Sequence, residues 1–137
     1  MPEPRILLDG LCFPEAPRWH ENRLFFSDMR KNNRVMAVDL AGDVETICEV
    51  PASPSGIGWL PDGRMIVVAM TDRRILRLEA DGSLVVHADL VAIARGPLND
   101  MVVDRQGSAY VGNFGFDMFA GAPMAPAKLA MVHPRCV

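Results

Sequence analysis

The sequence has few cysteines, no strong excess of charge and no long apolar run. Its 137 residues include 3 cysteines, 14 basic and 17 acidic side chains, which give a net charge of −3. Three cysteines that are far apart and odd in number form neither a disulfide framework nor a CxxC metal motif. The mild charge argues against a protein built on electrostatic binding to nucleic acid or to anionic lipid.

Signals for export and for membrane insertion are missing as well. The densest apolar stretch runs only from Met65 to Met70, far short of the roughly 18 residues that a membrane span needs. The opening Met-Pro-Glu-Pro-Arg lacks the basic and apolar regions of a secretory signal. Together with three unpaired thiols, these features predict a cytoplasmic protein with no membrane partner and no nucleic-acid partner.

What the sequence does contain is a core-forming composition and a repeat. Half of its residues are hydrophobic, which is enough to bury a core. Residues 13–48 alternate apolar runs with turns, and residues 54–87 repeat the same order. Trp19 and Trp59, forty positions apart, hold the same place in these two units, and Val103 holds it in a third. Each unit is a series of short runs separated by Gly, Asp, Asn and Pro turns.

Four short strands in roughly 40–45 residues, repeated in phase, are typical of a propeller blade. The sequence therefore predicts an all-β fold in which residues 1–137 form about three four-stranded blades of a β-propeller, at about residues 11–50, 53–90 and 97–137. A β-sandwich of similar hairpins is the alternative, and the fixed phase favours the propeller. Three blades do not close a ring, which needs about four to eight, so we expect an incomplete, truncated propeller.

The phase of the repeat places three polar residues at one end of the predicted channel. Glu15, Ser55 and Asn99 each stand four positions before the residue that marks the phase of their unit. Equivalent positions in successive blades lie on a ring around the axis, so the oxygens of Glu15 and Asn99 are predicted to come within about 5 Å, the span of one bound ion. Carboxylate and amide oxygens are the ligands that Ca²⁺ and Mg²⁺ prefer.

Each of these residues also has a plainer interpretation. Glu15 could be a solvated loop carboxylate, as most glutamates are. Asn99 could cap the turn at the entry to its strand, with Asp100 serving the same turn. Trp19 and Trp59 are expected to lie in the cores of their blades.

Basic residues recur at one hairpin of the repeat. A nucleic-acid surface and a solvated blade edge are both compatible with them, and charged side chains at an edge discourage unwanted strand pairing. The blade edge is the favoured interpretation. These residues are Arg30, Lys31, Arg34, Arg73, Arg74 and Arg77.

Four segments together match the opening of a known enzyme family. They are LCFPEAPRW (residues 11–19), PSGIG (54–58), DGR (62–64) and LNDMVVDRQG (98–107). The chain resembles the senescence-marker-protein/gluconolactonase/luciferin-regenerating-enzyme family from about residue 7 to residue 134. The resemblance implies a six-bladed propeller with one divalent metal ion at the channel mouth. It also implies hydrolysis of a small lactone or ester substrate.

The resemblance implies a role for three residues and shows one departure. Glu15 matches a glutamate that binds the metal in the family, and Asn99 matches an asparagine that contacts metal or substrate. Asp117 falls near an acidic residue that contacts the sugar. The implied ion is Ca²⁺, with Mg²⁺ or Zn²⁺ as alternatives. Pro97 stands where the family's lactonases have an arginine that binds sugar.

The resemblance covers roughly the first half of such an enzyme. The family's catalytic aspartate and its next metal-binding asparagine belong to later blades, so no catalytic residue is assigned here. We therefore expect the N-terminal portion of a metal-dependent lactone hydrolase. The alternative is a non-catalytic propeller fragment or interaction module, whose blades only present surfaces.

Overall fold

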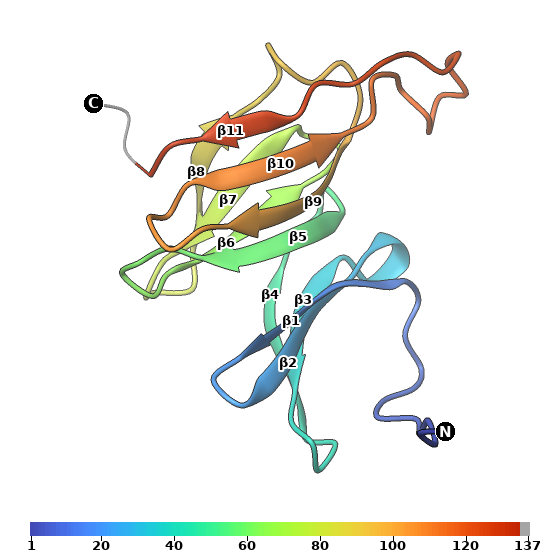
Figure 1. Cartoon of the computed structure of the whole chain (residues 1–137), viewed down its shortest axis with the longest axis vertical. Coiled ribbons are helices and arrows are strands. Elements are labelled where there is room, and N and C mark those ends of the chain that lie inside the picture. Colours follow the sequence, from blue (N-terminus) through green and yellow to red (C-terminus); the bar gives the residue numbers. More distant parts are fainter. Residues whose placement is uncertain (135–137) are drawn as a thin grey trace.

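The computed structural model describes residues 1–134 as three successive antiparallel β-sheets (Figure 1). Strands that follow one another in the chain pair in each sheet, as in a propeller blade. The predicted all-β fold of consecutive blades is confirmed, and the third sheet has three strands among the described residues. The described residues contain no helix with the length and hydrophobicity of a membrane span.

The strands are short, and in residues 1–134 they are accompanied by one 3₁₀ turn. The first sheet contains β1 (Pro14–His20), β2 (Arg23–Asp28), β3 (Arg34–Val38) and β4 (Val44–Glu49), with the 3₁₀ turn η1 (Arg30–Asn32) between β2 and β3. The second contains β5 (Pro54–Trp59), β6 (Met65–Ala69), β7 (Arg74–Leu78) and β8 (Leu84–Asp89). The third contains β9 (Leu98–Val103), β10 (Ala109–Asn113) and β11 (Ala130–Val132).

Aspartate side chains shape the turns between the strands. In each case an aspartate carboxylate accepts a hydrogen bond from the backbone N–H two residues further on, which imitates a backbone turn. Four of these turns also contain a glycine with positive φ, a conformation that costs glycine little. The strand boundaries are therefore encoded locally. The aspartates are Asp39, Asp62, Asp81, Asp89 and Asp104.

The innermost strand of each sheet carries the same irregularity. The pairing register shifts within residues 15–18 of β1, 54–57 of β5 and 98–101 of β9. In each case the inner strand has one more residue than its partner over the same stretch, which is a β-bulge. In β1 the bulge includes Ala16, which has a positive φ of 51°. A bulge bends its strand and re-aims the side chains around it. All three bulges lie near the start of their strands, at one end of the stacked sheets.

The sheets pack face to face, with β5 between β1 and β9 (Figure 1). One hydrophobic core fills the space between the second and third sheets, and another lies between the first and second. Glycines in β5 permit the close approach of β9. A Cβ atom on Gly56 would lie 2.3 Å from the backbone nitrogen of Met101, and one on Gly58 would lie 2.3 Å from the side chain of Val103.

The two tryptophans that mark the repeat differ in burial. Trp59 packs against the core between the first two sheets and stacks on His20, with 3.8 Å between ring centroids. Trp19 is 56% exposed, so its predicted place in a blade core is wrong. The equivalent position meets a preceding sheet in the second blade. Among the described residues, no sheet precedes the first blade, and Trp19 has no such neighbour.

The burial of Cys48 in β4 predicts that this thiol reacts more slowly than the exposed thiol of Cys12. Burial raises the pKa of the Cys48 thiol to about 11, whereas Cys12 is exposed. Because the thiolate is the reactive form, we expect iodoacetamide at pH 8 to alkylate Cys12 roughly tenfold faster than Cys48, or more. Mass spectrometry of the two peptides measures both rates, with Cys136 replaced by serine to remove a third signal. Equal rates would contradict the packing of β4.

Candidate functional site

The inner strands of the three sheets begin at equivalent points. In each sheet, the first residue of the inner strand pairs with the last residue of the strand that follows it. Glu15, Ser55 and Asn99 are the second residues of β1, β5 and β9. The three therefore occupy matching positions, at the end of the stack where the chain enters each inner strand.

The Glu15 carboxylate is held by the second blade. Glu15 is partly buried, and its Oε1 accepts a hydrogen bond from the Ser55 hydroxyl. Ser55 is fully buried, and its carbonyl oxygen accepts a hydrogen bond of 2.6 Å from the Ser27 hydroxyl. This chain of hydrogen bonds orients the carboxylate between the first and second blades. A freely solvated loop carboxylate would have no such partners.

Asn99 lies in the bulge of β9 beside an ion pair. It is partly buried, and the next residue, Asp100, belongs to the same strand rather than to a turn, which corrects the prediction for Asp100. The Oδ1 of Asp100 accepts a hydrogen bond of 2.7 Å from Nη2 of Arg18. The same nitrogen donates to the carbonyl oxygen of Met101 at 2.6 Å. Because Arg18 belongs to β1, these contacts join the first blade directly to the third.

Asp117 is placed differently from the other predicted site residues. It is exposed in the loop between β10 and β11. Its Oδ1 accepts a hydrogen bond of 3.1 Å from the backbone N–H of Ala120, and its carbonyl oxygen accepts one of 3.0 Å from Ala122. Both contacts stay within the loop. The structure thus shows Asp117 shaping that loop, and no hydrogen bond connects it to Glu15 or Asn99 among the described residues.

A buried carboxylate that the sequence did not single out anchors the entry to β1. Asp28, the last residue of β2, is fully buried. Its oxygens accept hydrogen bonds of 2.8 Å from the backbone N–H groups of Cys12 and Phe13, and one of 2.6 Å from the Asn32 amide. Nη2 of Arg34 lies 3.6 Å away. These contacts fix the chain where it approaches the candidate site.

The same contacts decide the charge of Asp28. Burial by itself raises the pKa of this carboxyl group. The hydrogen bonds from Asn32, Phe13 and Cys12, together with the charge of Arg34, outweigh burial, so the pKa lies below its ordinary value. Asp28 is therefore ionised at neutral pH.

Signals for the overlooked residues differ in kind. Asp28 directly follows the run from Leu24 to Ser27, and an acidic residue at the end of a largely apolar strand is a visible anomaly. Arg18 offers no local signal, because its partner Asp100 is 82 positions away in the sequence.

An apolar cavity of about 200 Å³ adjoins Glu15. The N-terminal segment supplies one part of its wall through Leu7, Leu8 and Leu11, which pack against the first sheet. Glu15 is the one ionisable side chain among the described residues that line it. The segment before β1 thus gives the carboxylate an apolar surrounding on that side. The remaining lining residues are Pro14, Pro17, Leu24, Phe26 and Val38.

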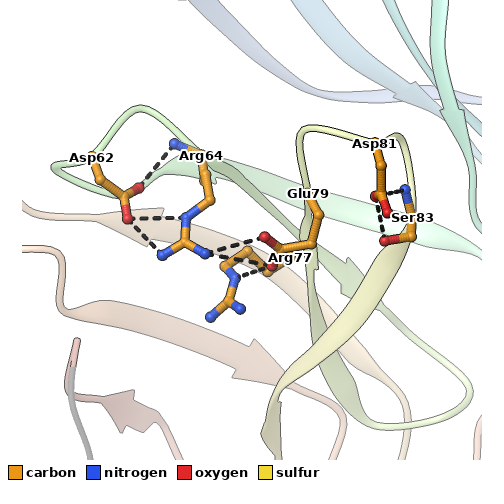
Figure 2. Close-up of polar contacts among 6 residues, drawn as sticks. All are labelled: Asp62, Arg64, Arg77, Glu79, Asp81 and Ser83. Carbon is orange, nitrogen blue, oxygen red and sulfur yellow. Dashed lines mark hydrogen bonds and ion pairs between the residues drawn. The ribbon is translucent and has the colours of Figure 1, made fainter.

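A second polar cluster lies where β5 and β7 end, at the opposite end of the second blade from Ser55. Figure 2 shows its side chains. Nη2 of Arg64 donates to Asp62 at 2.6 Å, and Nη1 donates to Glu79 at 3.2 Å. Nε of Arg77 also donates to Glu79, at 2.5 Å. The hydrogen bond from Arg64 lowers the pKa of Asp62, and the one from Arg77 lowers the pKa of Glu79. The cluster ties the turn after β5 to the end of β7, and its charges are paired within the blade.

The possible metal ligands at the end of the stack where the inner strands begin are few, and all of them are oxygen atoms. Among residues 1–134, no group of three or more His, Cys, Asp or Glu side chains is arranged to hold a metal. The equivalent positions provide the Glu15 carboxylate, the Asn99 amide oxygen and the Ser55 hydroxyl. These are hard oxygen donors, which fit Ca²⁺ in kind, although Ca²⁺ takes roughly 6–8 ligands in total.

The stacked meander sheets with adjoining inner strands define part of a β-propeller, and solved structures show the same fold. A gluconolactonase from Xanthomonas campestris has a TM-score of 0.72 at 21% identity, over 91% of this chain and 44% of that chain. A protein described provisionally as a gluconolactonase has a TM-score of 0.68 at 19% identity, over 93% and 47%. A virginiamycin B lyase from Staphylococcus aureus has a TM-score of 0.57 at 19% identity, over 74% and 35%.

The family follows from the sequence match. Residues 13–136 match the SMP-30/gluconolactonase/LRE-like region. The protein belongs to this family, as the resemblance of its motifs predicted. It spans about half the length of the two gluconolactonase-type structures. No curated protein has a significantly similar sequence.

Proposed function

We propose that this chain carries the first metal ligand and part of the substrate site of a metal-dependent lactone hydrolase. The observation that carries the proposal is the Glu15 carboxylate, oriented by buried Ser55 at the end of the stack where Asn99 also lies. Membership of the family supports the class of reaction. An oriented carboxylate that shares a ring of positions with an amide oxygen suits a hard divalent cation.

Each residue has a definite part in this proposal. Glu15 binds the ion, for which Ca²⁺ is the leading candidate and Mg²⁺ or Zn²⁺ the alternatives. Asn99 directs its amide oxygen to the ion or to the substrate, a small lactone or ester. Asp117, with its contacts confined to its loop, is the weaker candidate for contacting the substrate. A bound divalent cation supplies Lewis-acid polarisation of a carbonyl group.

A non-catalytic role is the second candidate. The observation that favours it is the small donor set, since the described residues contain no group of three or more His, Cys, Asp or Glu side chains arranged to hold a metal. On this hypothesis the blades present surfaces to a partner and the channel end binds no ion. The two candidates therefore differ in whether the chain recognises a divalent cation at all.

Calcium binding tests the proposal directly. We expect the chain to bind Ca²⁺ weakly, because it provides few of the ligands, and we expect Glu15→Gln to weaken that binding steeply. Isothermal titration calorimetry measures both affinities. Glu49→Gln, which changes an exposed glutamate on β4, is the matched control and should leave the affinity unchanged. Tight binding that Glu15→Gln does not affect would refute the assignment, and absence of binding would favour the non-catalytic role.

A further inference from the structure

We propose that Arg18 and Asp100 form a clasp that joins the first and third blades and fixes the spacing of Glu15 and Asn99. The role of the clasp in metal binding rests on the proposed function above. Within that function, Arg18 and Asp100 are positioning residues. They set the distance between two groups that would share the ion, and neither touches the ion itself.

Arg18, in the first blade, contacts two residues of the third blade. Its Nη2 donates to Oδ1 of Asp100 at 2.7 Å and to the carbonyl oxygen of Met101 at 2.6 Å. Its Nη1 donates to the carbonyl oxygen of Pro17 at 3.0 Å, which holds the guanidinium against its own strand. The planar guanidinium can serve these acceptors together, whereas an ammonium is a compact point charge.

The second blade has no side chain between Arg18 and the bulge of β9. Gly56 of β5 lies against the same part of β9, since a Cβ atom there would be 2.3 Å from the nitrogen of Met101 and 2.9 Å from the carbonyl carbon of Asp100. At this point β5 therefore places no side chain against β9. The bulges of the three inner strands meet here, because Arg18 ends the bulge of β1, Gly56 lies in that of β5, and Asp100 lies in that of β9.

The position of the clasp explains how it acts on the site. Glu15 and Arg18 stand at the two ends of the β1 bulge, and Asn99 directly precedes Asp100. A change in the distance between Arg18 and Asp100 should therefore move Glu15 and Asn99, because each is separated from its clasp residue by at most two residues of the same strand. The side chains of Arg18 and Asp100 are 27% and 53% exposed, and exposed pairs contribute little to stability. The effect of the clasp should therefore appear in the geometry of the site more than in the free energy of unfolding.

The chain contains a matched pair that has no connection to the channel end. Nη1 of Arg23 lies 2.6 Å from Oε2 of Glu45, and the side chains are 36% and 61% exposed. This pair joins β2 to β4 within the first blade. Arg23→Ala therefore removes an arginine–carboxylate contact of similar length and exposure, but does not uncouple two blades.

Calcium affinities of four proteins test the clasp. Isothermal titration calorimetry with Ca²⁺ alone is carried out on the unaltered chain, Arg18→Ala, Asp100→Leu and Arg23→Ala. We expect about tenfold weaker binding for Arg18→Ala and Asp100→Leu, the typical cost of losing a partner that orients a metal ligand. Arg23→Ala should bind as the unaltered chain does. If Arg18→Ala fails to fold, Asp100→Leu decides, because it keeps the approximate size of the side chain and removes the acceptor. Unchanged affinity in a folded clasp variant would overturn the proposal.

A metal-free measurement separates the clasp from the proposed function. In ¹⁵N-labelled protein without Ca²⁺, Asp100→Leu should shift the backbone amide signals of both Glu15 and Asn99, and Arg23→Ala should shift neither. A shift at Asn99 alone would only report the neighbouring substitution and would overturn the clasp. If the unaltered chain binds no Ca²⁺ and Glu15 nevertheless shifts, the metal proposal fails while the coupling of the blades stands.

Discussion

Replacing Gly56 by alanine is expected to lower the free energy of unfolding by about 3 kcal/mol, the upper part of the range for overpacking a core. The added Cβ would lie 2.3 Å from the backbone nitrogen of Met101 and 2.9 Å from the carbonyl carbon of Asp100. Both contacts are with backbone, which cannot move aside as a flexible side chain could. The inner strands β5 and β9 must then separate, and the core between the second and third sheets opens.

Gly112→Ala is the matched control for this prediction. Like Gly56, Gly112 lies in a strand, in its case β10 of the third sheet. A Cβ atom there would be 3.6 Å from the carbonyl oxygen of Asp100, an ordinary contact. We expect this variant to be unchanged or more stable by about 0.5 kcal/mol, since alanine restricts the unfolded chain. Urea denaturation followed by circular dichroism measures both variants. Equal stability of the two would show that β5 and β9 do not approach as closely as described.

Removing the Asp28 carboxylate is expected to cost about 3 kcal/mol, at the lower end of the range for breaking a buried charged network. Asp28→Ala leaves the N–H groups of Cys12 and Phe13 and the Asn32 amide without their acceptor. It also leaves the charge of Arg34 without its nearby carboxylate. Unpaired donors and an uncompensated charge each destabilise the folded state. Thermal and urea denaturation measure the loss.

The pH dependence of stability gives a sharper test of Asp28. Its pKa in the folded protein lies below the ordinary value of 3.8, so the unfolded chain binds a proton at this group more readily. The stability that the carboxylate contributes is therefore present above pH 3.8, and it is lost as the pH falls through the lower, folded pKa. We expect the unaltered chain to lose stability relative to Asp28→Asn below about pH 4. Parallel curves from pH 3 to 7 would contradict the proposed network.

The positions of the candidate site residues could be predicted because they follow the repeat. Glu15, Ser55 and Asn99 share one place in three units, and the strand register puts them at equivalent positions. The same logic was wrong for Trp19, which is 56% exposed. A repeat fixes where a residue stands in its blade. Its burial depends on whether another sheet lies against it.

The sequence by itself determined the blades of this protein. Short apolar runs and the Asp and Gly turns between them act over a few residues, so the order of strands is written locally. Only the tertiary structure decided what holds the inner strands together. Arg18 meets Asp100 across 82 positions, and Gly56 is required because β9 approaches it. No local pattern encodes such contacts, since they arise where bulges from three separate sheets meet around one axis.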